Sequence, residues 1–221
     1  MLPTIEYETL RDFSGLDTIR QSCVSRSNGI QVDNLPIPGF EALGSLESQL
    51  PEGSLVKNDL PKSSPGVTAV MEACHKLSHE VFKNLSHALE LPWEKYLGEM
   101  HEFTAPSMDS LKTFKSREPI RNEWSTLTII VNTASLQSAT VLYGTALSVF
   151  AEGATAVVNG ETVDTNLLSQ GQGVADGSWL VYYVSPNNDV FYTRTAGALM
   201  SPLSSDEYER RIRVRDLYPL A

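Results

Sequence analysis

The sequence predicts an α+β fold that is mainly β, in which a barrel or sandwich of short antiparallel strands lies between a helical N-terminal part and a C-terminal helix. Three observations indicate this. Short segments rich in Thr, Val, Ile, Tyr and Phe follow residue 110, a long amphipathic pattern precedes them, and a capped helical pattern closes the chain. Because 221 residues with 41% hydrophobic content can bury one sizeable core, we expect a single domain over residues 1–221.

The N-terminal part, residues 1–107, has a mixed pattern. We expect a strand at 4–7, a short helix at 16–23 and a strand at 29–32, which the prolines that follow bring to an end. Residues 49–66 contain three prolines and show no period, so we expect a loop there. Whether this loop closes over a site stays open.

A long helix is predicted over residues 67–91, because apolar side chains recur there at the spacing that keeps one helical face apolar. Pro92 is expected to end it. The two cysteines, Cys23 and Cys74, cannot form a disulfide framework and lack a metal-type spacing. We therefore expect both to be small buried apolar residues.

The predicted barrel core spans residues 108–203, and the closing helical part spans 204–221. Close spacing of the strands favours a barrel or sandwich, because such folds protect the edges of a sheet. The predicted strands are 111–114, 127–132, 140–143, 148–150, 154–159, 179–184 and 190–193. Ser204 and Glu207 fit a capping box, so we expect the last helix over about residues 206–217.

The charge balance excludes several classes of partner. Lys and Arg number 17 against 27 Asp and Glu, which gives a formal charge of −10. An acidic chain is poorly suited to neutralising phosphates, so we expect no nucleic acid and no anionic membrane as a partner. No apolar run approaches the roughly 18 residues of a membrane helix, and the start lacks a signal-peptide pattern. A cytoplasmic protein is expected.

Histidine is confined to the first half of the chain. His75 and His79 lie four residues apart, a spacing that can bind one metal, but their helical angle places them among polar residues, which favours a solvated surface. His87 and His101 have no obvious partner in the sequence. The strand-rich part contains neither His nor Cys, so a metal site there would use carboxylates and amides, which bind iron weakly.

A basic run lies at the start of the predicted barrel. It contains Lys112, Lys115 and Arg121 in an otherwise acidic chain. Two interpretations stay open: a charged strand end, or a polar cluster at a barrel mouth that holds a carboxylate or polarises a carbonyl. No nucleophile elbow, phosphate loop or dinucleotide motif is present.

Seven segments form an ordered series along the chain. They are 2–7, 29–38, the long helix with Leu91-Pro92, 108–112, 124–130, 156–161 and 202–218. In this order they resemble the isopenicillin N synthase type of 2-oxoglutarate and iron(II) dependent oxygenases. The resemblance implies a double-stranded β-helix barrel, of the jelly-roll or cupin-like kind, behind a helical N-terminal part.

The chain departs from that family at the motifs that carry the chemistry. Where the family has its iron-binding His-x-Asp, this chain has Arg121-Asn122-Glu123, and arginine cannot bind a metal. No histidine follows Gly160, where the second iron-binding histidine is expected. Where the family places Arg-x-Ser to hold 2-oxoglutarate, this chain has Asp176-Gly177-Ser178, and a carboxylate repels that cosubstrate. A degenerate member of the family is therefore expected, without metal and without cofactor.

The resemblance implies a metal-free, non-oxidative enzyme that catalyses a cyclisation, isomerisation or pericyclic-type rearrangement of a small, largely apolar intermediate, in a setting such as natural-product biosynthesis. The residues expected to act are Arg121, Glu123, Lys115 and Asp176 as catalytic groups and Lys112, Phe114, Trp124, Tyr143, Ser178 and Tyr182 as substrate-binding groups. The alternative is a non-catalytic pseudo-oxygenase subunit that stabilises or shapes an active oxygenase. A homodimer and a heterodimer with such an enzyme both stay open.

Overall fold

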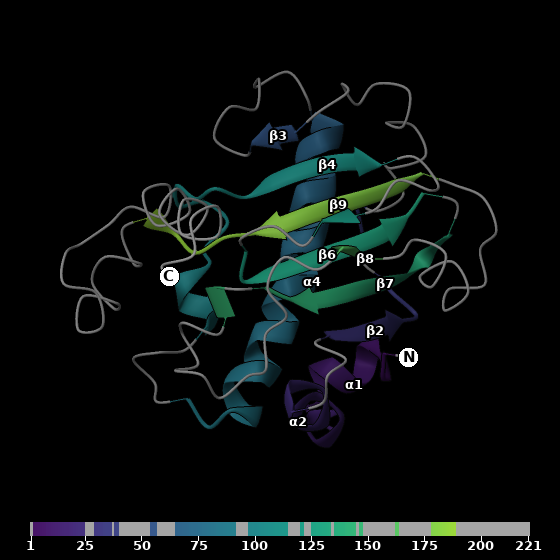
Figure 1. The fold of residues 1–221 in the computed structure, drawn as a ribbon, viewed down its shortest axis with the longest axis vertical. Coiled ribbons are helices and arrows are strands. Elements are labelled where there is room, and N and C mark those ends of the chain that lie inside the picture. Colours follow the sequence, from purple (N-terminus) through teal and green to yellow (C-terminus); the bar gives the residue numbers. More distant parts are fainter. Residues whose placement is uncertain are drawn as a thin grey trace, which may run out of the picture.

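A computed structural model gives the fold of the chain. The residues that it describes are 2–24, 29–36, 38–39, 54–56, 65–91, 97–114, 120–121, 125–133, 135–144, 146–147, 162–163 and 178–188. These residues form one large sheet, a long helix against one face of it, and a second, two-stranded sheet (Figure 1).

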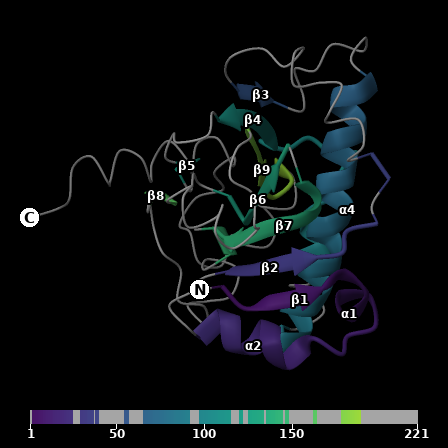
Figure 2. The ribbon, with the colours of Figure 1, turned by 90° about the vertical axis from the view of Figure 1, so that its right-hand side faces the viewer.

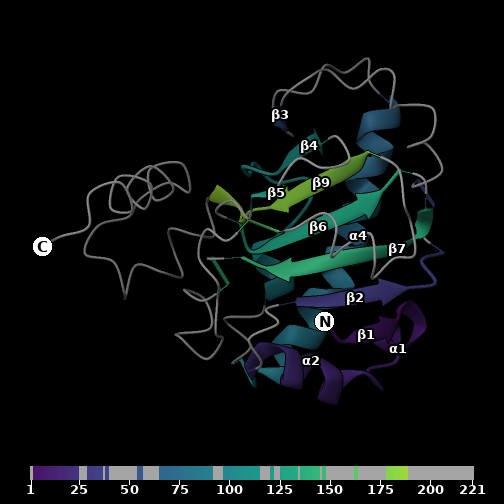
Figure 3. The same ribbon diagram turned by 45° about the vertical axis from the view of Figure 1, so that its right-hand side comes forward.

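The large sheet has seven strands in the order β1-β2-β7-β6-β9-β4-β3 (Figure 3). The pairings are antiparallel except for β1 with β2, which run parallel, so the sheet is mixed. The strands are β1 (Thr4–Glu6), β2 (Gly29–Asp33), β3 (Ser54–Val56), β4 (Ser110–Phe114), β6 (Leu127–Asn132), β7 (Ser135–Tyr143) and β9 (Trp179–Val184). The central strands β6 and β9 are buried along their whole length.

Helices cover one face of this sheet. The helix α4 (Pro65–Ala88) crosses behind the strands, and α1 (Tyr7–Arg11) and α2 (Leu16–Val24) lie near its C-terminal half (Figure 1). We call the covered side the helix face. Its side chains belong to the larger core cluster, which includes Phe82 of α4 with Ile129 and Leu180 of the sheet.

Side chains on the opposite side of the sheet form a smaller cluster. Alternate residues of a strand point to opposite faces, so the neighbours of helix-face residues lie on the side turned away from α4. We call this side the distal face. It carries Lys112, Phe114, Thr128, Ile130, Asn132, Thr140, Leu142, Trp179, Val181 and Tyr183.

The second sheet lies over the distal face. It consists of β5 (Ile120–Arg121) and β8 (Thr162–Val163), which pair antiparallel. Figure 2 shows β5 and β8 on one side of the large sheet and α4 on the other. Ile120 is fully buried and packs in the cluster of the distal face, so β5 covers that face directly.

The end of α4 differs from the prediction. Glu90 has a φ of 53°, the left-handed conformation, and two backbone hydrogen bonds close the helix around it: Leu91 N–H donates to the Ser86 carbonyl and Glu90 N–H donates to the His87 carbonyl, at 2.9 and 3.1 Å. This is a Schellman motif, which usually has glycine at the left-handed position. The helix thus ends at Ala88, and the backbone turns before Pro92 is reached.

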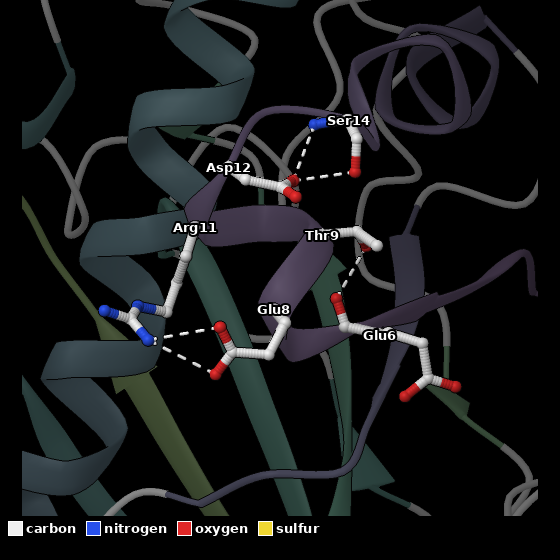
Figure 4. A network of polar contacts seen from close by, with 6 residues as sticks. All are labelled: Glu6, Glu8, Thr9, Arg11, Asp12 and Ser14. Atoms are coloured by element: carbon white, nitrogen blue, oxygen red, sulfur yellow. Dashed lines mark hydrogen bonds and ion pairs between the residues drawn. The ribbon is translucent and has the colours of Figure 1, made fainter.

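Short polar contacts fix the turn around α1 (Figure 4). Thr9 Oγ1 donates to the Glu6 carbonyl at 2.7 Å, and Arg11 pairs with Glu8 at 3.1 Å. After the helix, the amide and the hydroxyl of Ser14 both donate to Asp12 Oδ1, which lowers the pKa of the Asp12 carboxyl. These local contacts explain why the chain turns into a helix at Tyr7, where the sequence predicts the strand to continue.

Several predicted elements are confirmed and others are wrong. The strands β6 and β9 have the predicted bounds, and both cysteines are free and buried. Residues 49–66 are not a continuous loop, because they contain β3 and the first two residues of α4. The strand β7 begins five residues earlier than predicted, and β5 was not predicted. The predicted strands at 148–150, 154–159 and 190–193 and the helix at 206–217 lie outside the described residues.

No helix among the described residues has the length and apolar character that spanning a membrane requires.

Candidate functional site

The distal face mixes polar and aromatic side chains that are buried beneath β5. Thr128, Asn132 and Thr140 are each at most 1% exposed, and Trp179 and Tyr183 are equally inaccessible at 1% and 2%. Small-molecule sites combine apolar and aromatic walls with a few polar groups, which is the mixture of side chains on this face. This face is therefore the candidate site.

Lys112 supplies the positive charge of the candidate site. It lies on β4 opposite Val181 of β9, and its Nζ lies 5.2 Å from the centroid of the Tyr183 ring. An ammonium group over an aromatic face is stabilised by the ring quadrupole. The side chain is half-buried, so this cation is held at the edge of the apolar cluster. The charged ammonium group of Lys112, which can donate hydrogen bonds, thus lies beside the ring of Tyr183.

Phe114 and Ser178 lie at the same end of the site. Phe114 is opposite Trp179 and packs against the distal cluster. Ser178 precedes Trp179, and its carbonyl accepts hydrogen bonds from the Thr133 amide and hydroxyl, at 2.9 and 3.1 Å. These contacts hold the ends of β6 and β9 together. Two of the predicted binding residues, Lys112 and Phe114, thus lie on the distal face, and Ser178 directly precedes the strand that pairs with theirs.

Tyr143 and Tyr182 lie on the helix face, away from these residues. Tyr182 donates to Asp109 Oδ2 at 2.8 Å, while the Ser185 amide donates to Asp109 Oδ1 at 2.8 Å. The Tyr143 hydroxyl lies 2.5 Å from Ser22 Oγ. Burial raises the pKa of both phenols, and both hydroxyls have partners inside the core. Alternate residues of a strand point to opposite faces, so the two tyrosines point away from the distal face. The site proposed below therefore omits them.

The other predicted site residues are described in part or not at all. Arg121 lies in β5, next to Ile120, and the structure places its backbone beside Thr162 of β8. Lys115, Glu123, Trp124 and Asp176 lie outside the described residues. The roles predicted for these residues stay predictions.

All four histidines are among the described residues, and all lie on the helical side of the molecule. His75, His79 and His87 belong to α4, and His101 directly follows the 3₁₀ helix η4 (Leu97–Met100). The prediction that His75 and His79 lie on a solvated surface is wrong, because both are half-buried and line a cavity. Phe103, which contacts His75, covers this part of the helix.

His101 has partners that the sequence did not indicate. It is 1% exposed and stacks on Phe82, with ring centroids 4.2 Å apart. Its Nδ1 lies 2.6 Å from the Leu97 carbonyl and its Nε2 lies 2.7 Å from Thr126 Oγ1. A carbonyl only accepts, so Nδ1 carries a proton and donates to Leu97, while Nε2 and the Thr126 hydroxyl form the second hydrogen bond. His101 therefore joins α4, η4 and the residue before β6.

Comparisons with known proteins identify structures of similar fold. No family model matches the sequence, and no curated protein is similar to it. Solved structures do match: a full-length Neurospora crassa protein in complex with α-ketoglutarate has a TM-score of 0.62 at 10% identity, over 96% of each chain. JOX2, in complex with 2-oxoglutarate, iron and JA, has a TM-score of 0.62 at 14% identity, over 96% of this chain and 85% of its own.

A third similar structure is the dioxygenase for auxin oxidation from rice, with a TM-score of 0.58 at 13% identity, over 98% of this chain and 96% of its own. At these identities the similarity establishes architecture, and chemistry has to be argued from the site. The chain therefore has the fold of the 2-oxoglutarate and iron(II) oxygenases.

Proposed function

We propose that the chain is a metal-free, non-oxidative enzyme that binds a small, largely apolar intermediate on the distal face and catalyses its cyclisation, isomerisation or rearrangement. The two sheets form the halves of a double-stranded β-helix in this proposal, with the distal face inside. One observation carries it: every histidine of the chain lies on α4 or directly after η4, on the other side of the large sheet.

The residues present do not fit the iron that the fold family uses. Iron(II) in oxygenases of this type is held by two imidazoles and a carboxylate, and no imidazole lies on the distal face. Lys112, a cation of this face, repels a metal ion and favours a carboxylate or a carbonyl instead.

The distal face does fit a redox-neutral reaction. Trp179, Phe114 and Val181 provide apolar surface that holds a folded substrate and keeps water away. Lys112 can hold or polarise a carbonyl oxygen of the substrate, which stabilises negative charge that develops there. Arg121 and Glu123 follow Ile120 closely in the sequence. We assign to Glu123 the proton transfer that such a reaction needs, and to Arg121, which keeps its proton, the polarisation of a carbonyl.

The alternative, a pseudo-oxygenase subunit, needs a surface for its partner. Phe13, 36% exposed, is the one large hydrophobic side chain that is exposed among the described residues. A stable protein interface usually has an apolar centre, and this part of the chain offers none. The described residues thus favour the enzyme.

The experiment exploits the unchanged mass of an isomerisation product. We would incubate the purified protein with a small-molecule extract of its host cells and follow the compounds that it retains by mass spectrometry. The proposal predicts a retained compound that is converted to a product of identical mass. A product that has gained oxygen or lost a pair of hydrogens would contradict it.

Substitutions of single residues test whether the reaction takes place on the distal face. Lys112→Met keeps the length of the side chain and removes the charge, and should abolish retention and conversion. Lys83→Met removes a charge from α4, away from the distal face, and should change neither. Conversion that survives in Lys112→Met, Arg121→Ala and Glu123→Gln alike would overturn the assignment of the site. A chain that retains no compound but co-elutes with an active oxygenase would be the pseudo-oxygenase subunit.

A further inference from the structure

A cavity of about 500 Å³ lies on the helix side of the large sheet, against the middle of α4. His75 and His79 of α4 line it together with Tyr7 of α1 and Phe103 after η4. None of its lining residues belongs to the distal face. The cavity is therefore separate from the site of the proposed reaction.

Aromatic rings form much of the wall. The rings of His75 and Phe103 are in contact, with centroids 5.2 Å apart and planes tilted by 55°. The side chains of Tyr7, His79 and Phe103 are each half-buried and line the cavity, and Tyr7 and Phe103 also pack against the core. Ring walls on several sides favour a flat occupant that stacks or packs edge to face.

Charges around the cavity are paired or lie at its rim. Glu80 forms an ion pair with Lys83, at 3.0 Å, and Lys76 and Glu102 are exposed and of opposite sign. Burial, followed by the nearby Lys83, lowers the pKa of His79, so its imidazole is neutral at pH 7. The interior of the cavity thus offers rings, a phenol and a neutral imidazole, which do not compensate the burial of a charged ligand.

The wall opposite α4 is held in place by hydrogen bonds. The Leu97 amide donates to Ser86 Oγ at 3.1 Å, and the Asn187 amide donates to the Met100 carbonyl at 2.8 Å. The two bonds of His101 fix the same segment. A wall anchored to α4, β6 and the end of β9 is preformed, which reduces the entropy lost when a ligand binds.

We propose that this cavity binds a small, flat, uncharged aromatic molecule. Its volume lies within the range of small-molecule sites, about 300–1,000 Å³. The Tyr7 hydroxyl and the His79 imidazole are the groups that would hydrogen-bond the polar edge of the ligand, while Phe103 and His75 pack against its face.

The test uses three probes that share one ring system and differ in charge: indole, tryptamine and indole-3-propionate. We would titrate each into the full chain by calorimetry and map the site from amide chemical-shift changes. Indole should bind saturably, one molecule per chain, and shift the amides around η4. Tryptamine and indole-3-propionate should bind about tenfold more weakly, because a charge has to be desolvated.

Two phenylalanines provide a matched pair of variants. Phe103→Ala removes a wall of the cavity and should weaken indole binding about tenfold. Phe13 also packs against a histidine ring, that of His87 at 5.0 Å, but it does not line the cavity, so Phe13→Ala should bind indole like the wild type. Thr104→Trp, at an exposed position of the rim, should block the cavity and decides the matter if Phe103→Ala does not fold.

Three results would overturn the proposal. One is binding of either charged probe as tight as that of indole. Another is unchanged indole binding in Thr104→Trp. The third is loss of indole binding in Lys112→Met, which would place the ligand on the distal face.

Discussion

The two faces of the large sheet differ in the side chains that they carry. On the helix face, polar side chains are paired with one another: Tyr182 with Asp109, Tyr143 with Ser22, and His101 with Thr126. On the distal face, Lys112 lies over the ring of Tyr183, among buried threonines and an asparagine, under a two-stranded sheet. Side chains whose bonds end inside the core specify a structure, while a cation at the edge of a buried apolar surface is suited to a ligand.

We expect substitutions on the helix face to lower the stability of the chain and to leave the distal face intact. The largest effect is expected for Phe82→Ala. Phe82 is fully buried and stacks on His101, so its truncation leaves a cavity and should lower the free energy of unfolding by about 3–5 kcal/mol. Urea denaturation followed by circular dichroism measures the loss. A loss below about 1 kcal/mol would mean that the packing of α4 on the sheet is wrong.

Tyr182→Phe tests the role of the tyrosines on the helix face. The substitution keeps the ring and removes the hydroxyl that donates to Asp109, so we expect a loss of about 1–2 kcal/mol in unfolding free energy. Retention of the host compound should not change. Normal stability together with lost retention would instead show that Tyr182 contacts the substrate.

The smallest effect is a pH dependence that arises at His79. Its pKa is lowered from the ordinary value of 6.5, by burial and then by Lys83, so the unfolded chain binds this proton more readily than the folded one. The stability linked to His79 is complete above about pH 6.5 and is lost as the pH falls through its lowered pKa. His79→Gln should show a smaller fall in melting midpoint between neutral and mildly acidic pH than the wild type.

Lys83→Met provides the complementary variant, because it removes the cation that helps to lower the pKa of His79. It should also reduce the fall in melting midpoint, and by less than His79→Gln does. A fall of the same size in all three proteins would show that His79 does not contribute to the pH dependence.

The sequence predicted the elements whose pattern of apolar residues is visible within the element itself. The periods of α4 and of the strands β6 and β9 are visible in the order of residues, because each element buries a continuous face. The strand β3 was missed because three residues have no period of their own and pair only through contact with β4. The left-handed residue that ends α4 is a glutamate, for which no composition rule gives a signal.

The candidate site was predictable only in part, because sequence does not give the face on which a residue lies. Lys112 and Phe114 were predicted on the first barrel strand and lie on the distal face. Tyr182 is adjacent in sequence to Tyr183, and a shift of one residue moves the side chain to the other face. The cavity at α4 depends on Phe103 folding back over His75, a contact that the helical pattern alone cannot show.

We propose that this oxygenase-like fold works without iron, and a thermal-shift titration can test this. The purified chain would be melted with manganese(II) as an iron surrogate, with 2-oxoglutarate, and with both, beside the similar Neurospora crassa protein as a positive control. A ligand that binds only the folded state raises the melting midpoint. We expect that manganese(II) and 2-oxoglutarate together do not raise the melting midpoint of this chain, while they raise that of the control. A joint rise larger than that with either compound alone would contradict it and identify a working metal site.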